Sequence, residues 1–223
     1  MSKHTDLGNY TIATLKRNFE LVPKDLGKDV HLSKRGMTFD TQSWEICGIG
    51  HLCVMRMHAF LGLMKMETIV IAPFEVDLPL FNADWVSAFG TETQIAELYD
   101  TQLEPWPEES QKKFEGIKAD FAYIADAPSG EHWYDTILYP CSFHKKGKGL
   151  TDRFNNAAEQ YIDLFVAELA ITEKCPADQK RARVSEFARK LAENDGPAVN
   201  TMAKLFGEET MKRIVLKHMY GVS

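Results

Sequence analysis

Residues 65–86, KMETIVIAPFEVDLPLFNADWV, are the most informative part of the chain because they read as two strands joined by a proline-containing turn. Apolar and β-branched side chains fill residues 66–72, which is typical of a strand buried on at least one face. Pro73 is expected to end this strand, since proline has no N–H to donate to a neighbouring strand. After the apolar turn at residues 78–81, a second strand is expected through residues 85–89. The stretch therefore predicts two neighbouring strands of one sheet.

Two carboxylates, Glu67 and Asp84, lie within this apolar strand sequence. A carboxylate in such surroundings is either paired or has a raised pKa that favours its neutral form. A carboxylic acid that stays neutral near pH 7 can donate a proton. The pattern indicates acid chemistry, with two alternatives: a solvent-facing charge for Glu67, and for Asp84 a strand-edge aspartate that binds a backbone N–H.

The rest of the chain supplies further strands and then helices. Strands are predicted at residues 37–39, 44–46, 52–61, 94–98 and 134–143. Their short connections favour an antiparallel meander. Helical spacing of apolar residues predicts a helix at residues 9–22 and several helices from Thr151 onward. The expected fold is α/β: a three-layer α/β/α sandwich with a central antiparallel sheet, in one domain over residues 1–223.

Composition excludes several classes of protein. A hydrophobic content of 44% and a charged content of 26% are typical of an ordinary globular chain, and a net charge of −6 argues against nucleic-acid binding. The first residues, MSKHTDLGNY, lack the apolar segment of a signal peptide, and no apolar run reaches the length of about 18 residues that spans a bilayer. These features predict a cytoplasmic protein with neither a nucleic-acid nor a membrane partner.

Sequence motifs for metals and nucleotide cofactors are also missing. The four cysteines form no C-x-x-C pair, and their spacing fits neither a zinc ribbon nor an iron–sulfur cluster. There is no G-x-G-x-x-G after a predicted strand and no phosphate-binding P-loop motif. We therefore expect no metal site and no bound nucleotide.

Three segments together resemble the ferredoxin-dependent bilin reductases. Pro73, residues 78–81 (LPLF) and Asp84 match the central motif of that family, residues 56–58 (RMH) its basic-Met-His segment, and residues 204–209 (KLFGEE) the element before its last helix. Within the family, the phycocyanobilin:ferredoxin oxidoreductases are the most similar. The resemblance implies an α/β/α fold that holds a linear tetrapyrrole, biliverdin or a related bilin, between the sheet and the C-terminal helices. It also implies one-electron steps from external ferredoxin, protons from side chains, and no bound cofactor.

The resemblance implies three catalytic residues. Asp84 matches the family's proton-donating aspartate, three residues after the Leu-Pro-Leu-Phe turn. Glu67 falls where the family has a catalytic histidine, whereas the position of the family's catalytic glutamate, on the preceding strand, holds Phe60. The acidic partner of Asp84 would thus have moved to the neighbouring strand, which would change the tetrapyrrole atom that receives the proton. Asp195 lies near an acidic or amide position of the family after one inserted residue. A turn aspartate that stabilises a helix end is the alternative for Asp195.

Four further residues are implied to bind the substrate. His58 matches a histidine beside the family's binding pocket, although a satisfied core histidine is the alternative. Phe60 falls where the family has a catalytic glutamate, and Phe81 belongs to the apolar turn beside Asp84. Lys145 replaces an arginine and could hold a bilin propionate, but without the bidentate geometry of a guanidinium. The basic residues around Lys145 could instead be a solvated loop or a docking patch for acidic ferredoxin.

Two other functions compete with bilin reduction. The Phe-Gly-Glu-Glu element at residues 206–209 also resembles red chlorophyll catabolite reductase, which implies another open-chain tetrapyrrole as substrate. A protein that kept the fold and the pocket but lost the chemistry would be a tetrapyrrole-binding protein. The sequence leaves open which double bond would be reduced.

Overall fold

The strands of the chain join in one antiparallel sheet. A computed structural model describes residues 6–128, 131–194 and 197–223. Within these residues the sheet has eight strands, in the order β1-β3-β4-β5-β6-β7-β8, with β2 paired to β3. The strands are β1 (Leu21–Pro23), β2 (His31–Lys34), β3 (Met37–Ile46), β4 (Gly50–Ala59), β5 (Met64–Pro73), β6 (Leu80–Ala88), β7 (Thr91–Tyr99) and β8 (Phe143–Gly147).

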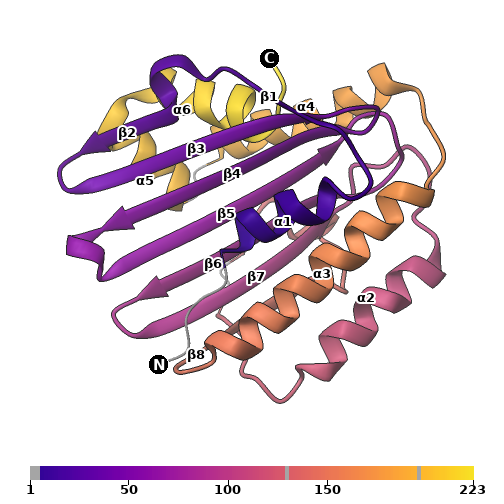
Figure 1. The fold of residues 1–223 in the computed structure, drawn as a ribbon, viewed down its shortest axis with the longest axis horizontal. Coiled ribbons are helices and arrows are strands. Elements are labelled where there is room, and N and C mark those ends of the chain that lie inside the picture. The colour runs from indigo at the N-terminus through magenta and orange to yellow at the C-terminus, as the bar shows by residue number, and fades with distance from the viewer. Residues whose placement is uncertain (1–5, 129–130, 195–196) are drawn as a thin grey trace.

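Helices cover both faces of the sheet (Figure 1). One face carries α1 (Leu7–Leu15), α2 (Glu108–Asp120) and α3 (Thr151–Ile171). The other carries α4 (Ala177–Glu193), α5 (Pro197–Phe206), α6 (Glu208–Arg213) and the π-helical segment η4 (Ile214–Met219). Short 3-10 turns lie at η1 (Gly27–Val30), η2 (Phe60–Gly62) and η3 (Asp135–Ile137). This is the three-layer α/β/α sandwich with a central antiparallel sheet that the sequence predicts.

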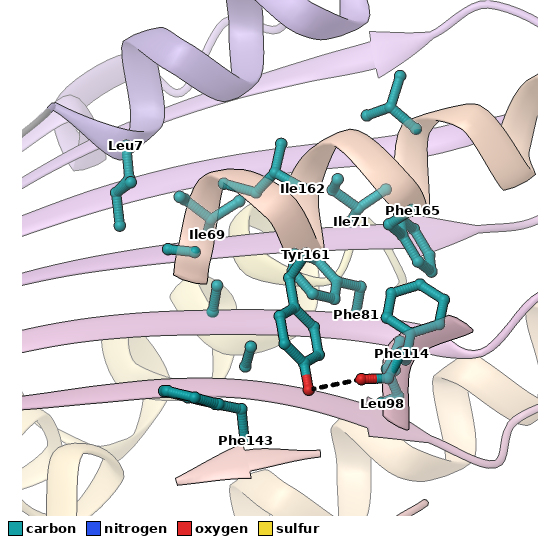
Figure 2. Packing of buried hydrophobic residues seen from close by; sticks show 14 of the residues in the cluster. Leu7, Ile69, Ile71, Phe81, Leu98, Phe114, Phe143, Tyr161, Ile162 and Phe165 are labelled. Atoms are coloured by element: carbon teal, nitrogen blue, oxygen red, sulfur yellow. Dashed lines mark hydrogen bonds between the residues drawn. The ribbon is translucent and has the colours of Figure 1, made fainter. Parts of the chain in front are cut away.

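The α1–α3 face holds an apolar core made by alternate strand residues (Figure 2). Ile69 and Ile71 of β5 and Phe81 of β6 point to this side because successive strand residues face opposite ways. Phe81 stacks on Phe165 of α3 with ring centroids 4.9 Å apart. The buried Tyr161 donates its O–H to the Cys141 carbonyl over 2.6 Å, so the phenol is satisfied inside the core.

The opposite face is tied to the Leu-Pro-Leu-Phe turn by a buried lysine. Lys180 of α4 is fully buried, and its Nζ donates to the carbonyls of Leu78 at 2.6 Å and Thr101 at 2.8 Å. Burial lowers the pKa of Lys180 to about 8. Because an ammonium without partners is costly to bury, these bonds fix α4 against the turn at the end of the sheet.

Some predicted boundaries were wrong. Residues 37–39 and 44–46 belong to one strand, and the first helix ends at Leu15. Residues 134–143 are mostly irregular, and the strand of this region is β8. The apolar side chains of residues 134–142 resemble a strand pattern, but in that segment only Leu138 makes a bridge to β7, and Pro140 has no N–H to extend it.

Among the described residues, no helix combines the length and the apolarity needed to cross a bilayer.

Candidate functional site

A cavity of about 410 Å³ lies between the sheet and the C-terminal helices. Its volume is within the range of roughly 300–1,000 Å³ that is typical of small-molecule sites. Its floor is formed by β4–β7, and its roof by α4, α5 and the residues around η4. The lining residues are Met55, Met66, Thr68, Asn82, Asp84, Val86, Ile95, Glu97, Tyr99, Tyr134, Phe187, Leu191, Ala198, Val199, Met202, Val215, Met219 and Tyr220.

Asp84 is the acid on the floor of this cavity. It lies on β6 opposite Thr68 of β5, and both side chains face the roof. Thr68 Oγ1 donates to one carboxylate oxygen, and Asn82 Nδ2 donates to the other at 2.8 Å. Removal from solvent raises the pKa of Asp84 to about 6, and the nearby charge of Glu97 adds to this rise. Asp84 is therefore partly protonated near neutral pH.

A second acid, Glu97, shares the floor with Asp84. Glu97 on β7 is paired in register with Asn82, so its carboxylate lies diagonally across from Asp84 on the same face. It accepts a hydrogen bond from the Tyr99 hydroxyl, and its other oxygen lies 2.8 Å from His144 Nε2. The His144 side chain is 22% exposed, so this pair connects the cavity with the solvent side of β8.

Aromatic residues form one wall of the cavity. The rings of Tyr99 and Phe187 lie 4.6 Å apart, and Tyr134 meets Tyr99 edge-on at 5.5 Å. Burial raises the pKa of Tyr134 to about 12 and also raises the pKa values of Tyr99 and Tyr220. The phenols are therefore neutral near pH 7 and present flat apolar surfaces with hydroxyl donors, a combination suited to a conjugated polar ligand.

A buried ion-pair network holds the roof in place. Asp29 of η1 accepts from Arg213 at 2.6 and 2.9 Å and lies 2.9 Å from His218 Nε2. The His218 carbonyl accepts in turn from Ser43 Oγ at 2.7 Å and from His51 Nε2 at 2.8 Å. Burial lowers the pKa of His51 to about 3, so this imidazole is neutral.

The network fixes a segment with π-helical backbone, which in proteins is frequent at functional sites. The segment η4 and the residue after it place Val215, Met219 and Tyr220 in the cavity. Gly221 then packs on the His51 ring with φ of +67°, where a Cβ atom would come within 2.5 Å of His51. Only glycine therefore fits at this close approach.

Two predicted site residues, Glu67 and Phe81, lie on the face of the sheet opposite the cavity. Glu67 points toward α1, accepts from the backbone N–H groups of Leu7 at 2.9 Å and Gly8 at 3.1 Å, and pairs with Arg56 at 3.0 Å. A carboxylate here stabilises the first turn of α1. Phe81 is buried against α3. Glu67 therefore does not share the cavity with Asp84, because Thr68 is the β5 residue paired with Asp84 and neighbouring residues of a strand face opposite ways.

Three other predicted residues, His58, Phe60 and Lys145, are also outside the cavity. His58 is exposed on the α1 face, and Phe60 is 56% exposed in the turn after β4. Lys145 is buried on the face opposite the cavity and pairs with Asp126 at 2.7 Å. These placements do not support contact between the three side chains and a ligand in the cavity. Asp195 lies outside the described residues.

The structure adds residues that the sequence analysis missed. Glu97 carries the same signal as Asp84, a carboxylate within apolar strand sequence, and could have been found in this way. His144 and Lys145 are adjacent on β8, so their side chains face opposite sides of the sheet. Only the side of β8 that meets the cavity decides that His144, and not Lys145, pairs with a cavity residue. Tyr134 and Tyr220 come from irregular segments, and no local pattern in the sequence assigns them to a site.

The chain shares its fold with a bilin-binding enzyme. No protein-family model and no curated protein sequence matches it. Among solved structures, it is similar to the crystal structure of phytochromobilin synthase from tomato in complex with biliverdin, with a TM-score of 0.71 and 15% identity. The match covers 96% of this chain and 81% of that chain. At this level of identity, the likeness establishes a common fold.

Proposed function

We propose that this chain reduces a linear tetrapyrrole, biliverdin or a related bilin, in the cavity above Asp84. The observation that carries the proposal is a carboxyl group with a pKa of about 6 on the floor of a mainly apolar cavity. The fold supports it, because the similar phytochromobilin synthase structure contains biliverdin. Electrons come from reduced ferredoxin in single steps, and the proposed reaction uses no resident metal or flavin.

Asp84 supplies a proton after electron transfer. A tetrapyrrole that accepts one electron becomes more basic, and the neutral Asp84 carboxyl transfers its proton to it. The hydrogen bonds from Thr68 and Asn82 then stabilise the carboxylate that remains. Addition of two electrons and two protons reduces one double bond, so the acid must be reprotonated or a second donor must act.

Glu97 and His144 are suited to supply the second proton. Glu97 faces the cavity, and His144 reaches solvent from the other side of the pair. His144 Nε2 lies 2.8 Å from Glu97 but is not aligned for a hydrogen bond. A proton taken up by His144 can pass to Glu97, and from there into the cavity, once the imidazole ring turns toward the carboxylate. Glu97, rather than Glu67, is therefore the second carboxylate of the proposed mechanism.

Ferredoxin would dock on exposed basic residues. Lys146 and Lys148 are exposed at the end of β8, whereas Lys145 is buried and paired. The two exposed ammonium groups offer a positive surface to an acidic electron donor in an otherwise acidic chain.

One anaerobic experiment tests the proposal. The protein is incubated with biliverdin, ferredoxin and a reducing system, and the absorption spectrum is followed. We expect progressive loss and a blue shift of the long-wavelength band. A stable complex spectrum would identify a tetrapyrrole-binding protein instead, and an unchanged spectrum of free biliverdin would point to another ligand.

A further inference from the structure

Three turns project from one end of the sheet (Figure 1). They are residues 35–36 between β2 and β3, residues 60–63 between β4 and β5, and residues 89–90 between β6 and β7. The last two are in contact, since the Phe89 N–H donates to the Leu63 carbonyl over 3.0 Å. We call the side chains of these turns, with the flanking Lys34 and Lys65, the turn surface.

The turn surface exposes large apolar side chains. Phe60 is 56%, Leu63 59% and Phe89 67% exposed, and Leu61 is fully exposed. The Phe60 and Phe89 rings lie 5.9 Å apart, so they form one patch. Half of the large hydrophobic side chains exposed among the described residues gather at this one end. Clustering of this kind indicates an interaction site.

The backbone of these turns is unfavourable for the residues that they carry. Among the described residues, the non-glycine residues with positive φ are Arg35, Phe60, Leu61 and Phe89, all within the turn surface. Positive φ favours glycine or asparagine, and bulky side chains adopt it at a cost in free energy. Strained residues of this kind cluster at functional sites, where a local cost is retained for a functional gain.

The charge of the turn surface is positive. Lys34, Arg35 and Lys65 are exposed, and the structure gives none of them an ion-pair partner among the described residues. The segments 34–37, 60–65 and 88–91 contain no aspartate or glutamate, although the chain carries a net charge of −6. Apolar side chains and uncompensated cations therefore occur together.

The cavity approaches this end of the sheet. Met66 of β5 and Val86 of β6 line the cavity and are paired in register. This pair lies two residues along the strands from the Met64–Ala88 pair, which adjoins the turns. A surface bound to the turns would therefore lie close to the cavity.

We propose that the turn surface docks the protein peripherally on an anionic lipid bilayer, with Phe60, Leu61 and Phe89 entering the headgroup region. Apolar side chains at the acyl boundary combined with cations at the lipid phosphates are the elements of interfacial binding. A protein partner requires a continuous face of roughly 800 Å², whereas these side chains protrude on separate turns. The sequence predicted no membrane partner because it has no membrane-spanning segment. Peripheral binding through these turns needs no such segment.

Sedimentation with sucrose-loaded vesicles tests this proposal without tetrapyrrole or electron donor, so its failure is separate from failure of the proposed reaction. We expect the protein to bind phosphatidylcholine vesicles containing about one third phosphatidylglycerol, and to bind pure phosphatidylcholine less well. Leu61→Asn combined with Phe89→Asn should weaken binding about tenfold or more, because asparagine keeps the left-handed backbone and removes the apolar group. Lys65→Gln should weaken binding to the anionic vesicles about fivefold.

The matched control is Ile171→Asn, which removes a side chain that is 72% exposed at the end of α3. It should bind vesicles like the wild type. Equal binding of the wild type and the Leu61→Asn/Phe89→Asn variant, or no preference for anionic vesicles, would overturn the proposal. So would a wild-type dimer in velocity sedimentation that this double variant dissociates, since the turn surface would then join two copies of the chain.

Discussion

Asp84 is an aspartate with a raised pKa, because it lies on the floor of the cavity and away from solvent. The usual pKa of an aspartate is 3.8, and burial on the cavity floor raises this value to about 6. At pH 7 roughly a tenth of the carboxyl groups then carry a proton, about a hundredfold more than in an exposed aspartate. In the proposed reaction this fraction would let Asp84 donate a proton, provided that the carboxylate is reprotonated between steps.

Asp84→Asn should separate binding from chemistry. Asparagine keeps the size and most of the hydrogen bonding but has no transferable proton, so the variant should bind biliverdin and lose turnover by about 10²–10⁴-fold. A one-electron-reduced radical should accumulate and be visible by electron paramagnetic resonance. The control is Asp120→Asn at the exposed end of α2. Wild-type turnover of Asp84→Asn would exclude Asp84 as the donor.

The raised pKa of Asp84 also predicts a dependence of stability on pH. The folded state holds the proton more tightly than the unfolded state, so this contribution is complete below pH 3.8 and is lost as the pH rises through about 6. Asp84→Asn resembles the neutral acid at every pH. Denaturant unfolding should therefore show the variant about 1–3 kcal/mol more stable than the wild type at pH 7 and nearly equal to it near pH 4. Equal stability at both pH values would contradict the raised pKa.

At the scale of elements, the β6–β7 turn retains a residue that the turn geometry disfavours. Phe89 and Gly90 both have positive φ, as a two-residue type I′ hairpin turn requires, and Asn-Gly is the preferred sequence there. Phe89→Asn should therefore raise the free energy of unfolding by about 0.5–1 kcal/mol, measured in urea. Ile171→Asn, outside the turns, should change it by less than about 0.5 kcal/mol. A less stable Phe89→Asn would show that the Phe60–Phe89 contact outweighs the backbone cost.

The C-terminal roof depends on the buried Asp29. The hydrogen bonds from Arg213, with a further contribution from His218, lower the pKa of Asp29 to about 2. Stability from this ionised carboxylate is present above pH 3.8 and is lost as the pH falls through about 2. Asp29→Asn should therefore cost about 2–4 kcal/mol at pH 7.

The Asp29 variant has a structural readout besides stability. If the network positions η4, loss of Asp29 should also weaken biliverdin binding, because Met219 and Tyr220 would no longer be held in the cavity. Asp120→Asn again serves as the control for unfolding and for binding. A variant with normal stability and normal binding would show that η4 is held by apolar packing alone.

For the whole molecule, the proposed electron supply predicts a dependence on a partner protein. NADPH alone should give no turnover, whereas reduced ferredoxin should, with a rate that falls as salt is added. Lys146→Gln combined with Lys148→Gln should lower the rate at low salt about 3–10-fold and reduce the salt effect. The charge-matched control is Lys16→Gln combined with Arg17→Gln, just after α1. Turnover with NADPH in the absence of any redox protein would contradict the proposed donor.

The layers of this protein could be predicted from the sequence alone. Periodicity is a local property, so the strand pattern around residues 66–72 and the helical spacing after Thr151 were enough to predict an antiparallel sheet between helices. The local pattern marked Asp84 as a carboxylate within apolar strand sequence, but a strand-edge aspartate explained that pattern equally, and the role of proton donor came from the resemblance to the bilin reductases. Glu97 stands in an equally apolar strand sequence at residues 95–99, so the same local pattern marks it.

Which side chains share the cavity depends on contacts between distant parts of the chain. Successive side chains of a strand point to opposite faces of the sheet. The sequence does not determine which of the two faces packs against the C-terminal helices. Glu67 and Lys145 therefore fell on the far side, while Glu97 and His144 joined Asp84. The roof depends on contacts such as Asp29 with His218, 189 positions apart, which no local pattern encodes.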